Sequence, residues 1–262
     1  MTGDRKYIDT HSHIYDKAFA GEEEEIVRRA LNAGVGIILQ PDVDSTERQA
    51  MADLYRRFPD VFRNMAGLYP GSVGPDWEKE FEMVEEFAHS EGIVAIGEIG
   101  LDYHYSADTS ELQKAAFKAQ LELAARLGLP VNIHLREATE DFFKVLDECR
   151  GLGIRGSLHA FSGSVETFRR VQKYGEWYVG IGGVLTFKNA GVAEAIRHIP
   201  LESILLETDS PYLTPVPFRG RRNESSYIPL IAAKIAEIKQ ADPDEVAAVT
   251  TANAERLFNI KL

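Results

Sequence analysis

KYIDTHSH (residues 6–13) is the first strand-like stretch of the chain, and its ending distinguishes between two kinds of α/β fold. A dinucleotide-binding sheet continues its first strand into a Gly-x-Gly-x-x-Gly turn, whereas this stretch ends in His11-Ser12-His13. On an extended segment, residues i and i+2 point to the same side, so both imidazoles face one way. The stretch therefore favours a strand that presents metal ligands over one that leads into a nucleotide-binding turn.

Further β-branched runs follow, and amphipathic helical patterns alternate with them along the chain. The strand-like runs are residues 34–40, 62–69, 93–101, 130–135, 155–161, 177–183 and 203–209. The helical patterns are residues 22–34, 45–58 (with Ser45 and Thr46 as the expected N-cap), 76–92, 108–128, 137–153, 164–175 and 189–200. Eight strand units in 262 residues predict an α/β fold with a parallel sheet closed into a (β/α)8 TIM barrel. An open doubly wound sheet is the alternative.

The composition is that of an ordinary globular protein, with 44% hydrophobic and 27% charged residues. No linker or low-complexity tract divides the chain, so we expect a single domain over residues 1–262. No run approaches the ~18 apolar residues that cross a bilayer, and the N-terminus shows no signal-peptide pattern. We therefore expect a soluble, cytoplasmic protein without a membrane partner. No exposed apolar stripe is evident in the sequence pattern, so a monomer is the default expectation. Cys149, the single cysteine, is expected to be packed within a helical stretch.

The formal net charge of −12 argues against a protein that coats long nucleic acids. However, the longest irregular stretch, residues 210–225, carries Arg219, Arg221 and Arg222, and Arg136 follows the fifth strand-like run. A guanidinium group binds phosphate through two parallel hydrogen bonds. We expect these four arginines to contact substrate phosphate. A short single strand, a strand end or a nick suits such a local basic site better than a long duplex.

Six side chains suited to metal binding fall at or near the carboxyl ends of the strand-like runs: His11, His13, Glu98, His134, His159 and Asp209. In a barrel these ends meet at one mouth, where the active site lies. Imidazole and carboxylate groups together suit divalent cations such as Mg²⁺, Mn²⁺ or Zn²⁺. Glu98 is expected to bridge two ions through its two oxygens. Two ions about 3.5–4 Å apart activate a water and stabilise the attacking and leaving oxygens.

Three further residues are candidates around this site. Glu207 and Asp9 stand two residues before Asp209 and His11, so each is predicted to orient a ligand, with a purely structural pairing as the alternative. His104 follows the fourth strand-like run. It is a candidate for substrate contact at the mouth, although a loop histidine without a metal role is the alternative.

Several motifs resemble those of the TatD family of metal-dependent deoxyribonucleases, within the amidohydrolase-like metal-dependent hydrolases. They are IDTHSH (8–13), AIGEIGLDYHY (95–105), NIHLREA (132–138), LHAFSGS (158–164), LLETDSPYLTPVPFRGRRN (205–223) and TTANAERLFNI (250–260). The resemblance runs nearly from end to end. It implies a TIM barrel with a divalent-metal site and a magnesium- or manganese-dependent nuclease activity, often exonucleolytic from the 3′ end, with zinc in some structures.

The resemblance also implies how the ligands are divided between two ions. One ion is held by His11, His13 and Asp209, the other by His134 and His159, and Glu98 lies between them. Two departures from the family pattern leave these ligands intact. Tyr69 stands where the family usually has a histidine, so it offers a hydrogen bond to phosphate without positive charge. The segment 223–227 (NESSY) lacks the family's proline and adds Glu224, which is predicted to loosen the loop and weaken DNA binding.

These observations predict a divalent-metal-dependent hydrolase of DNA phosphodiester bonds, acting as a 3′–5′ exonuclease on single strands or ends. Asp209 is predicted to accept the proton of the attacking water, and Glu98 to be essential for turnover. Two other classes of function stay open. One is an amidohydrolase or esterase acting on a small C–N or C–O substrate, because the same ligands can polarise a carbonyl. The other is a metal-binding scaffold without catalytic activity.

Overall fold

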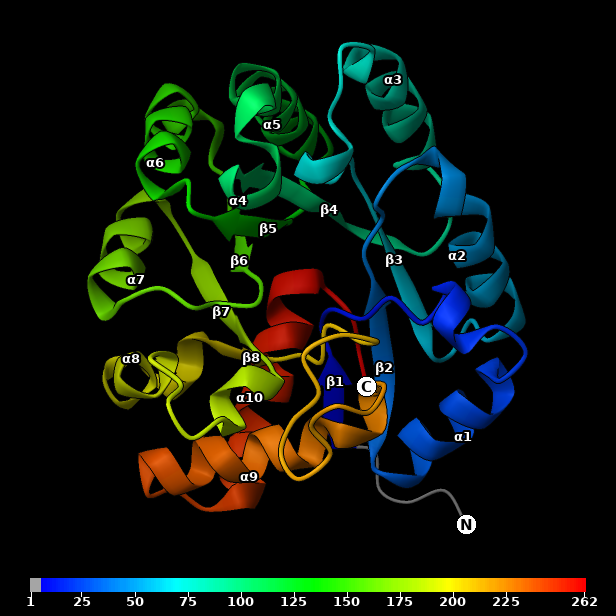
Figure 1. The fold of residues 1–262 in the computed structure, drawn as a ribbon, viewed down its shortest axis with the longest axis vertical. Helices are drawn as coiled ribbons and strands as arrows, with labels where there is room; N and C mark the ends of the chain where they lie inside the picture. Colours follow the sequence, from blue (N-terminus) through cyan, green and yellow to red (C-terminus); the bar gives the residue numbers. More distant parts are fainter. Residues whose placement is uncertain (1–5) are drawn as a thin grey trace.

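The computed structural model describes residues 6–262, except for the side chains of residues 105 and 106. The described residues form eight parallel strands that pair in chain order. Their bounds are β1 (Tyr7–Asp9), β2 (Val35–Gln40), β3 (Phe62–Ala66), β4 (Ile93–Asp102), β5 (Val131–Arg136), β6 (Gly156–Leu158), β7 (Trp177–Ile181) and β8 (Ile204–Leu206). The helices form a ring outside the strands, so the predicted TIM barrel is confirmed (Figure 1).

The barrel closes where the segments after β1 and β8 run side by side. The backbone N–H of Thr10 donates to the carbonyl of Leu206 at 2.9 Å, and that of Asp209 donates to the carbonyl of His11 at 2.9 Å. The loop of residues 210–225, yellow to orange in Figure 1, lies across the centre of the ring. Two of the predicted metal ligands are therefore brought together by the closure of the barrel itself.

The α-helices cover the predicted helical patterns to within a few residues and add three more. Their bounds are α1 (Glu23–Asn32), α2 (Ser45–Arg57), α3 (Trp77–Phe87), α4 (Tyr103–Ser106), α5 (Ser110–Leu127), α6 (Thr139–Glu148), α7 (Val165–Val171), α8 (Val192–His198), α9 (Ile228–Lys239) and α10 (Pro243–Phe258). No helical pattern was assigned to α4, α9 or α10. Cys149 is buried directly after α6, as expected. Among the described residues, no helix combines the length and the apolar character needed to cross a bilayer.

Two details of the predicted elements are wrong. The N-cap of α2 is Asp44, whose carboxylate accepts the N–H of Thr46 at 2.9 Å, because Ser45 is already helical. Several strands are also shorter than their apolar runs. In particular, β1 ends at Asp9, so both histidines of the His-x-His pair lie beyond the strand. The backbone there is held by the neighbouring segments at the barrel mouth instead of by a continued ladder.

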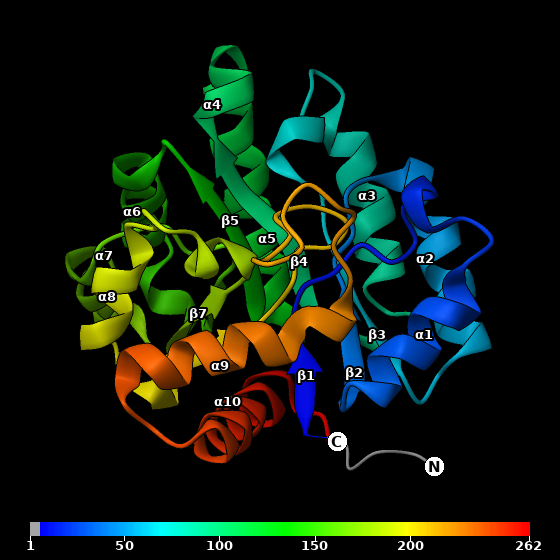
Figure 2. The same ribbon diagram turned by 60° about the horizontal axis from the view of Figure 1, so that its bottom comes forward.

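The barrel interior has an apolar layer at one end and a polar layer at the other. One apolar cluster lies inside the barrel beside α10, which covers the amino ends of the strands (Figure 2). Leu257 and Phe258 of α10 form it together with Ile8, Ile37, Leu39, Met65, Tyr178 and Leu205. Toward the carboxyl ends, the buried side chains are polar: His11, Glu98, Asn132, Ser157 and Glu207. Burial of the apolar layer stabilises the barrel and leaves the opposite end free for chemistry.

Candidate metal centre

The six side chains predicted as metal ligands come together at the carboxyl end of the barrel. Glu98 and His134 project from β4 and β5, and the others lie in the segments after β1, β6 and β8: His11, His13, His159 and Asp209. Two residues here have a left-handed backbone, Ala160 with φ 44° and Asp209 with φ 55°. Such conformations are uncommon outside glycine and gather at functional sites.

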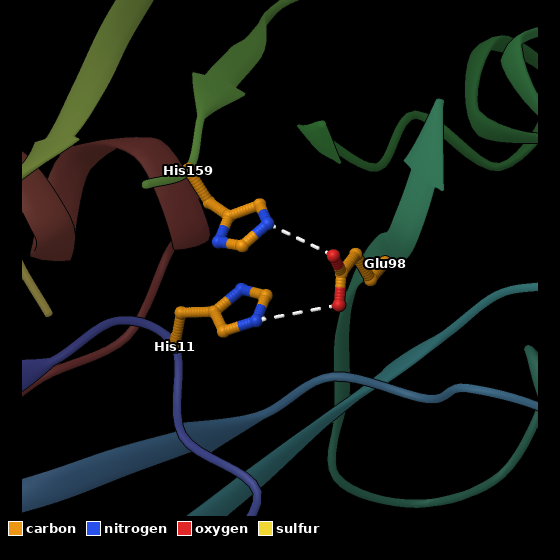
Figure 3. Close-up of side chains that lie close together, drawn as sticks. All are labelled: His11, Glu98 and His159. Atoms are coloured by element: carbon orange, nitrogen blue, oxygen red, sulfur yellow. Dashed lines mark ion pairs between the residues drawn. The ribbon is translucent and has the colours of Figure 1, made fainter. Parts of the chain in front are cut away.

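The carboxylate of Glu98 divides its two oxygens between two groups of histidines (Figure 3). Its Oε1 lies 2.8 Å from Nδ1 of His134 and 2.8 Å from Nε2 of His159. Its Oε2 lies 3.4 Å from Nε2 of His11 and 3.8 Å from Nε2 of His13. A carboxylate placed in this way has the geometry of a bridge between two cation positions.

His11, His13 and Asp209 form a second cluster of donor atoms. The Nε2 atoms of the two histidines are 3.2 Å apart, and Oδ1 of Asp209 lies 3.6 Å and 3.5 Å from them. Within the described residues, two groups have donor atoms close enough to hold one ion: His11–Glu98–His159 and His11–His13–Asp209. Nitrogen and carboxylate donors that converge in this way fit a divalent cation.

Neighbouring hydrogen bonds fix which nitrogen of each histidine is available. Nδ1 of His11 lies 2.7 Å from Oδ1 of Asn132, whose amide nitrogen donates to Ser157 at 3.0 Å. An amide oxygen only accepts, so Nδ1 of His11 carries a proton, and in the neutral ring that binds a metal the lone pair is on Nε2. Nδ1 of His13 lies 2.8 Å from the hydroxyl of Tyr15. Sequence reasoning did not single out Asn132 or Tyr15, although Asn132 begins the NIHLREA motif that contains His134.

Asp102 is a further functional residue that sequence reasoning missed. It is completely buried, and its Oδ2 accepts a hydrogen bond from Nε2 of His134 at 2.9 Å. Nδ1 of His134 is thereby directed toward Glu98. A carboxylate that holds the outer nitrogen of a histidine ligand orients the ring and raises its basicity. The available signal was its spacing from Glu98, since residues i and i+4 of a strand share a face.

The electrostatics of the site favour positive charge between its carboxylates. Burial opposes ionisation of Glu98 and Asp209, but the surrounding histidines outweigh it and hold both pKa values below the ordinary range. Burial also disfavours the charged forms of His11 and His134, but nearby carboxylates raise their pKa values to about 10 and about 9. For His159, burial and the neighbouring His11 lower the pKa to about 4. These surroundings suit bound cations.

Glu207 and Asp9 are buried and contact the segments that carry ligands. Asp9 accepts hydrogen bonds from the N–H and hydroxyl of Thr208 at 3.0 Å and 2.6 Å. Glu207 accepts the N–H of Ala160 at 2.5 Å, and its Oε1 lies 3.8 Å from Nδ1 of His159. Burial raises the pKa of Glu207 to about 8 and that of Asp9 to about 6. These positions are consistent with the predicted role of orienting ligands.

Of the two candidates for substrate contact, Tyr69 lies closer to the ligands. Its ring centroid is 5.1 Å from that of His134, and its hydroxyl lies 3.4 Å from Oδ2 of Asp102. Burial and nearby carboxylates raise the pKa of Tyr69, so it stays a neutral donor. His104 is exposed, and its Nδ1 lies 2.8 Å from Oε1 of Glu137.

The four arginines predicted to bind phosphate lie in different surroundings. Arg222 pairs with Glu22, with 2.7 Å between Nη2 and Oε2, and also donates to the carbonyl of Ala18. The others are Arg219 and Arg221, exposed on the loop after β8, and Arg136, partly buried at the end of β5. The guanidinium of Arg222 is therefore held in an ion pair within the protein, which argues against its binding a substrate phosphate.

Glu224 contradicts the prediction that the NESSY segment is loosened. Glu224 is only 8% exposed, and its carboxylate accepts hydrogen bonds from the guanidinium of Arg29 in α1 at 2.7–3.1 Å. The hydroxyl of Ser226 also donates to it. The prediction is wrong because the added carboxylate forms an ion pair with Arg29, which lies near the opposite end of the chain. Its predicted effect on DNA binding stays a prediction.

Fold and site together define a barrel with histidine and carboxylate side chains positioned to bind a metal, and comparisons with known proteins identify the family. The family model described as TatD related DNase matches residues 8–259. The uncharacterized metal-dependent hydrolase YabD of Bacillus subtilis (strain 168) is 37% identical over 254 residues, covering 97% of this chain and 99% of that protein. The 3'-5' ssDNA/RNA exonuclease TatD of Salmonella typhimurium is 35% identical over 260 residues, covering 97% and 99%.

A solved structure shows the same fold. The crystal structure of YJJV, a TatD homolog from Escherichia coli K12, superimposes with a TM-score of 0.90 at 30% identity. The match covers 98% of this chain and 99% of that one. The chain therefore belongs to the TatD family of metal-dependent hydrolases.

Proposed function

We propose that this hydrolase cleaves phosphodiester bonds of DNA, acting as a 3′–5′ exonuclease on single strands or strand ends. Relatives at 35% identity that are named 3'-5' ssDNA/RNA exonuclease support this substrate class. The exposed arginines on the loop after β8 support it as well, since they place positive charge locally on a chain with a net charge of −12.

Two divalent cations fit the residues present. His11, His13 and Asp209 would hold one, His134 and His159 the other, with Glu98 shared. The observation that carries this assignment is the division of the Glu98 oxygens between the two groups of histidines. Bound Mg²⁺, Mn²⁺ or Zn²⁺ would supply Lewis-acid stabilisation of charge on the phosphoryl oxygens.

Asp209 is the residue proposed to accept the proton of the attacking water. Its lowered pKa keeps it ionised at neutral pH, the form that a base requires. Its side chain is 16% exposed, against 5% for Glu98, so water reaches Asp209 more readily. Asp102, Asn132 and Tyr15 hold the ligands in place and do not exchange protons with the substrate.

The phosphate groups are proposed to contact Arg136, Arg219 and Arg221, and Tyr69 would donate a hydrogen bond to the same substrate. These contacts neutralise charge that grows on the phosphoryl oxygens as the nucleophile attacks. Arg222 is left out of this set because its guanidinium is paired with Glu22.

The test uses protein stripped of metal and single-stranded DNA labelled at either the 3′ or the 5′ end. Mg²⁺, Mn²⁺ and Zn²⁺ are added back separately to wild type, Glu98→Ala and the control Glu86→Ala, which alters an exposed side chain of α3. We expect wild type and control to shorten the strand from its 3′ end. The rate of Glu98→Ala should fall by at least about 100-fold, because the bridge between the two positions is lost.

The other outcomes separate the rival functions. Full activity of Glu98→Ala at wild-type metal occupancy would refute the site. Ester or lactam hydrolysis that exceeds strand cleavage would favour an amidohydrolase or esterase. Bound ions without turnover of any substrate would favour a scaffold.

A further inference from the structure

Three large apolar side chains are exposed within five consecutive residues, 212–216, of the loop after β8. Among the described residues, the exposed large hydrophobic side chains are Met83 (39%), Leu152 (38%), Tyr212 (55%), Leu213 (40%) and Val216 (46%). Three of these lie within residues 212–216, and we call Tyr212, Leu213 and Val216 the apolar ledge. Single exposed hydrophobic residues are common, whereas apolar groups gathered in one place mark a binding surface.

The apolar ledge borders the metal centre directly. The ring centroid of Tyr212 lies 6.3 Å from that of His13, and the N–H of Tyr212 donates to the carbonyl of Asp209 at 2.9 Å. Leu213 lines a cavity of about 40 Å³ together with Asp209 and Glu207. A group that rests on the apolar ledge is therefore next to the position where the bond is cleaved.

Hydrogen bonds on several sides hold the apolar ledge in place. The side-chain amide of Asn223 donates to the carbonyl of Tyr212 at 2.6 Å, and the hydroxyl of Tyr212 lies 3.4 Å from Oδ2 of Asp16. The N–H of Val216 donates to the hydroxyl of Thr186 at 2.8 Å. A surface that is already ordered loses little conformational entropy when it binds a partner.

We propose that the apolar ledge is a nucleobase subsite, with the ring of Tyr212 stacked on the base next to the phosphodiester bond that is cleaved. This inference rests on the proposed nuclease function and extends it. A base within a duplex has its faces covered by its neighbours, whereas a base at a single-stranded end offers a free face. Stacking on an aromatic ring is worth about 1–3 kcal/mol per base and tolerates any base. The protein would thus require an unpaired base at this position without selecting its identity.

The charges beside the apolar ledge favour a nucleic acid over a second protein as its occupant. Arg219 and Arg221 stand on the same loop, with their guanidinium groups 4.4 Å from the ring centroid of Phe187 and 5.7 Å from that of Phe218. An apolar platform with flanking cations matches a strand that alternates flat bases with anionic phosphates. The proposed metal centre, whose His13 ring lies 6.3 Å from that of Tyr212, would act on the backbone of the same strand.

The test compares a single-stranded oligonucleotide with the same strand carrying abasic tetrahydrofuran residues at its last two 3′ positions. Values of kcat/KM are measured for wild type, Tyr212→Ala and Tyr212→Phe. Leu152→Ala is the control, because it removes an exposed side chain of similar exposure outside this loop. We expect wild type to prefer the complete strand by about 10- to 100-fold, which corresponds to the stacking of one base. Tyr212→Phe and the control should keep this preference, and in Tyr212→Ala the ratio should fall toward one.

The remaining outcomes overturn one proposal or both. If wild type cleaves both strands equally well, the nuclease function stands and the base subsite is refuted. If Tyr212→Ala keeps the wild-type ratio, another residue holds the base and the assignment to the apolar ledge is wrong. If wild type cleaves neither strand with any metal, the proposed function fails and the subsite with it.

Discussion

The hydroxyl of Tyr15 lies 2.8 Å from Nδ1 of His13 and 2.5 Å from the carbonyl oxygen of Pro41. The carbonyl only accepts, so the single hydroxyl hydrogen is donated to Pro41 and the hydroxyl oxygen accepts from His13. Nδ1 of His13 is therefore the protonated nitrogen. Its Nε2 keeps a lone pair, directed at the cation position beside Nε2 of His11. A phenol that no ligand motif identifies thus sets the tautomer of a ligand.

Replacing Tyr15 with phenylalanine removes the acceptor of the His13 N–H and keeps the ring. We expect the affinity for Mn²⁺ or Zn²⁺ to fall by about 10- to 100-fold, the usual effect of losing a partner that orients a ligand. Competition against a chelator measures this affinity. Tyr174→Phe is the matched control, because its hydroxyl bonds to Asp147 on the surface. Unchanged metal affinity in Tyr15→Phe would show that the tautomer is fixed in another way.

The barrel and the convergence of the six proposed ligands at its mouth were predictable because strand periodicity and strand ends are local features of the sequence. His134 and Asp209 are far apart in the chain, yet both follow from the rule that parallel strands end at one mouth. The partners of the ligands were not predictable by that rule. Asn132 and His11 are 121 residues apart, and their hydrogen bond depends on which side chains the closed barrel brings into contact.

Contacts between residues far apart in the chain also explain why the predicted loosening around Glu224 is wrong. An added carboxylate in a loop indicates solvation and mobility when only the local sequence is considered. Its partner, Arg29, lies 195 residues away in α1, and only the folded chain brings the two together. Ion pairs between residues so far apart in the chain are not predicted by any periodic pattern in the sequence.

Gly180 in β7 is predicted to be necessary for the position of Glu207. A Cβ atom at residue 180 would lie 1.9 Å from Oε2 of Glu207, which is buried and bound to Ala160. Because Glu207 has little room to move, we expect Gly180→Ala to lower the free energy of unfolding by about 1–3 kcal/mol. Urea denaturation measures it. Gly151→Ala is the control, since nothing lies within 4 Å of the added atom there. Equal stability of the two variants would show that Glu207 relaxes freely.

Metal binding is predicted to stabilise the fold, and His11 is predicted to contribute to this effect. His11 is a proposed ligand of the first cation position, and its Nε2 also lies 3.4 Å from Oε2 of Glu98, the carboxylate proposed to be shared by both positions. A cation at 100 times its Kd adds about 2.7 kcal/mol to the stability of wild type. After treatment with a chelator, thermal unfolding is followed as Mn²⁺ or Zn²⁺ is added. The rise in Tm should be clearly reduced in His11→Ala, which loses a ligand of one position, and retained in His198→Ala, which alters an exposed histidine of α8. An equal rise in both variants would contradict the assignment.

The ion pair between Glu224 and Arg29 predicts a specific dependence of stability on pH. Burial raises the pKa of Glu224, but hydrogen bonds from Arg29 and Ser226 outweigh it and hold the pKa below its ordinary value of 4.5. The unfolded chain therefore takes up this proton more readily, so the stabilisation is complete above about pH 4.5 and is lost as the pH falls through the folded pKa. At pH 7, Glu224→Gln should lower the free energy of unfolding by about 1–3 kcal/mol, because a hydrogen-bonded charge is removed.

The difference between wild type and Glu224→Gln should shrink as the pH is lowered from 6 to 3, since protonation removes the same charge from wild type. Urea denaturation at each pH measures both proteins. Glu78→Gln, a change on the exposed face of α3, is the control and should follow wild type throughout. A difference that stays constant down to pH 3 would mean that the carboxylate contributes through packing. In that case the ion pair with Arg29 would not be what anchors the loop beside the metal centre.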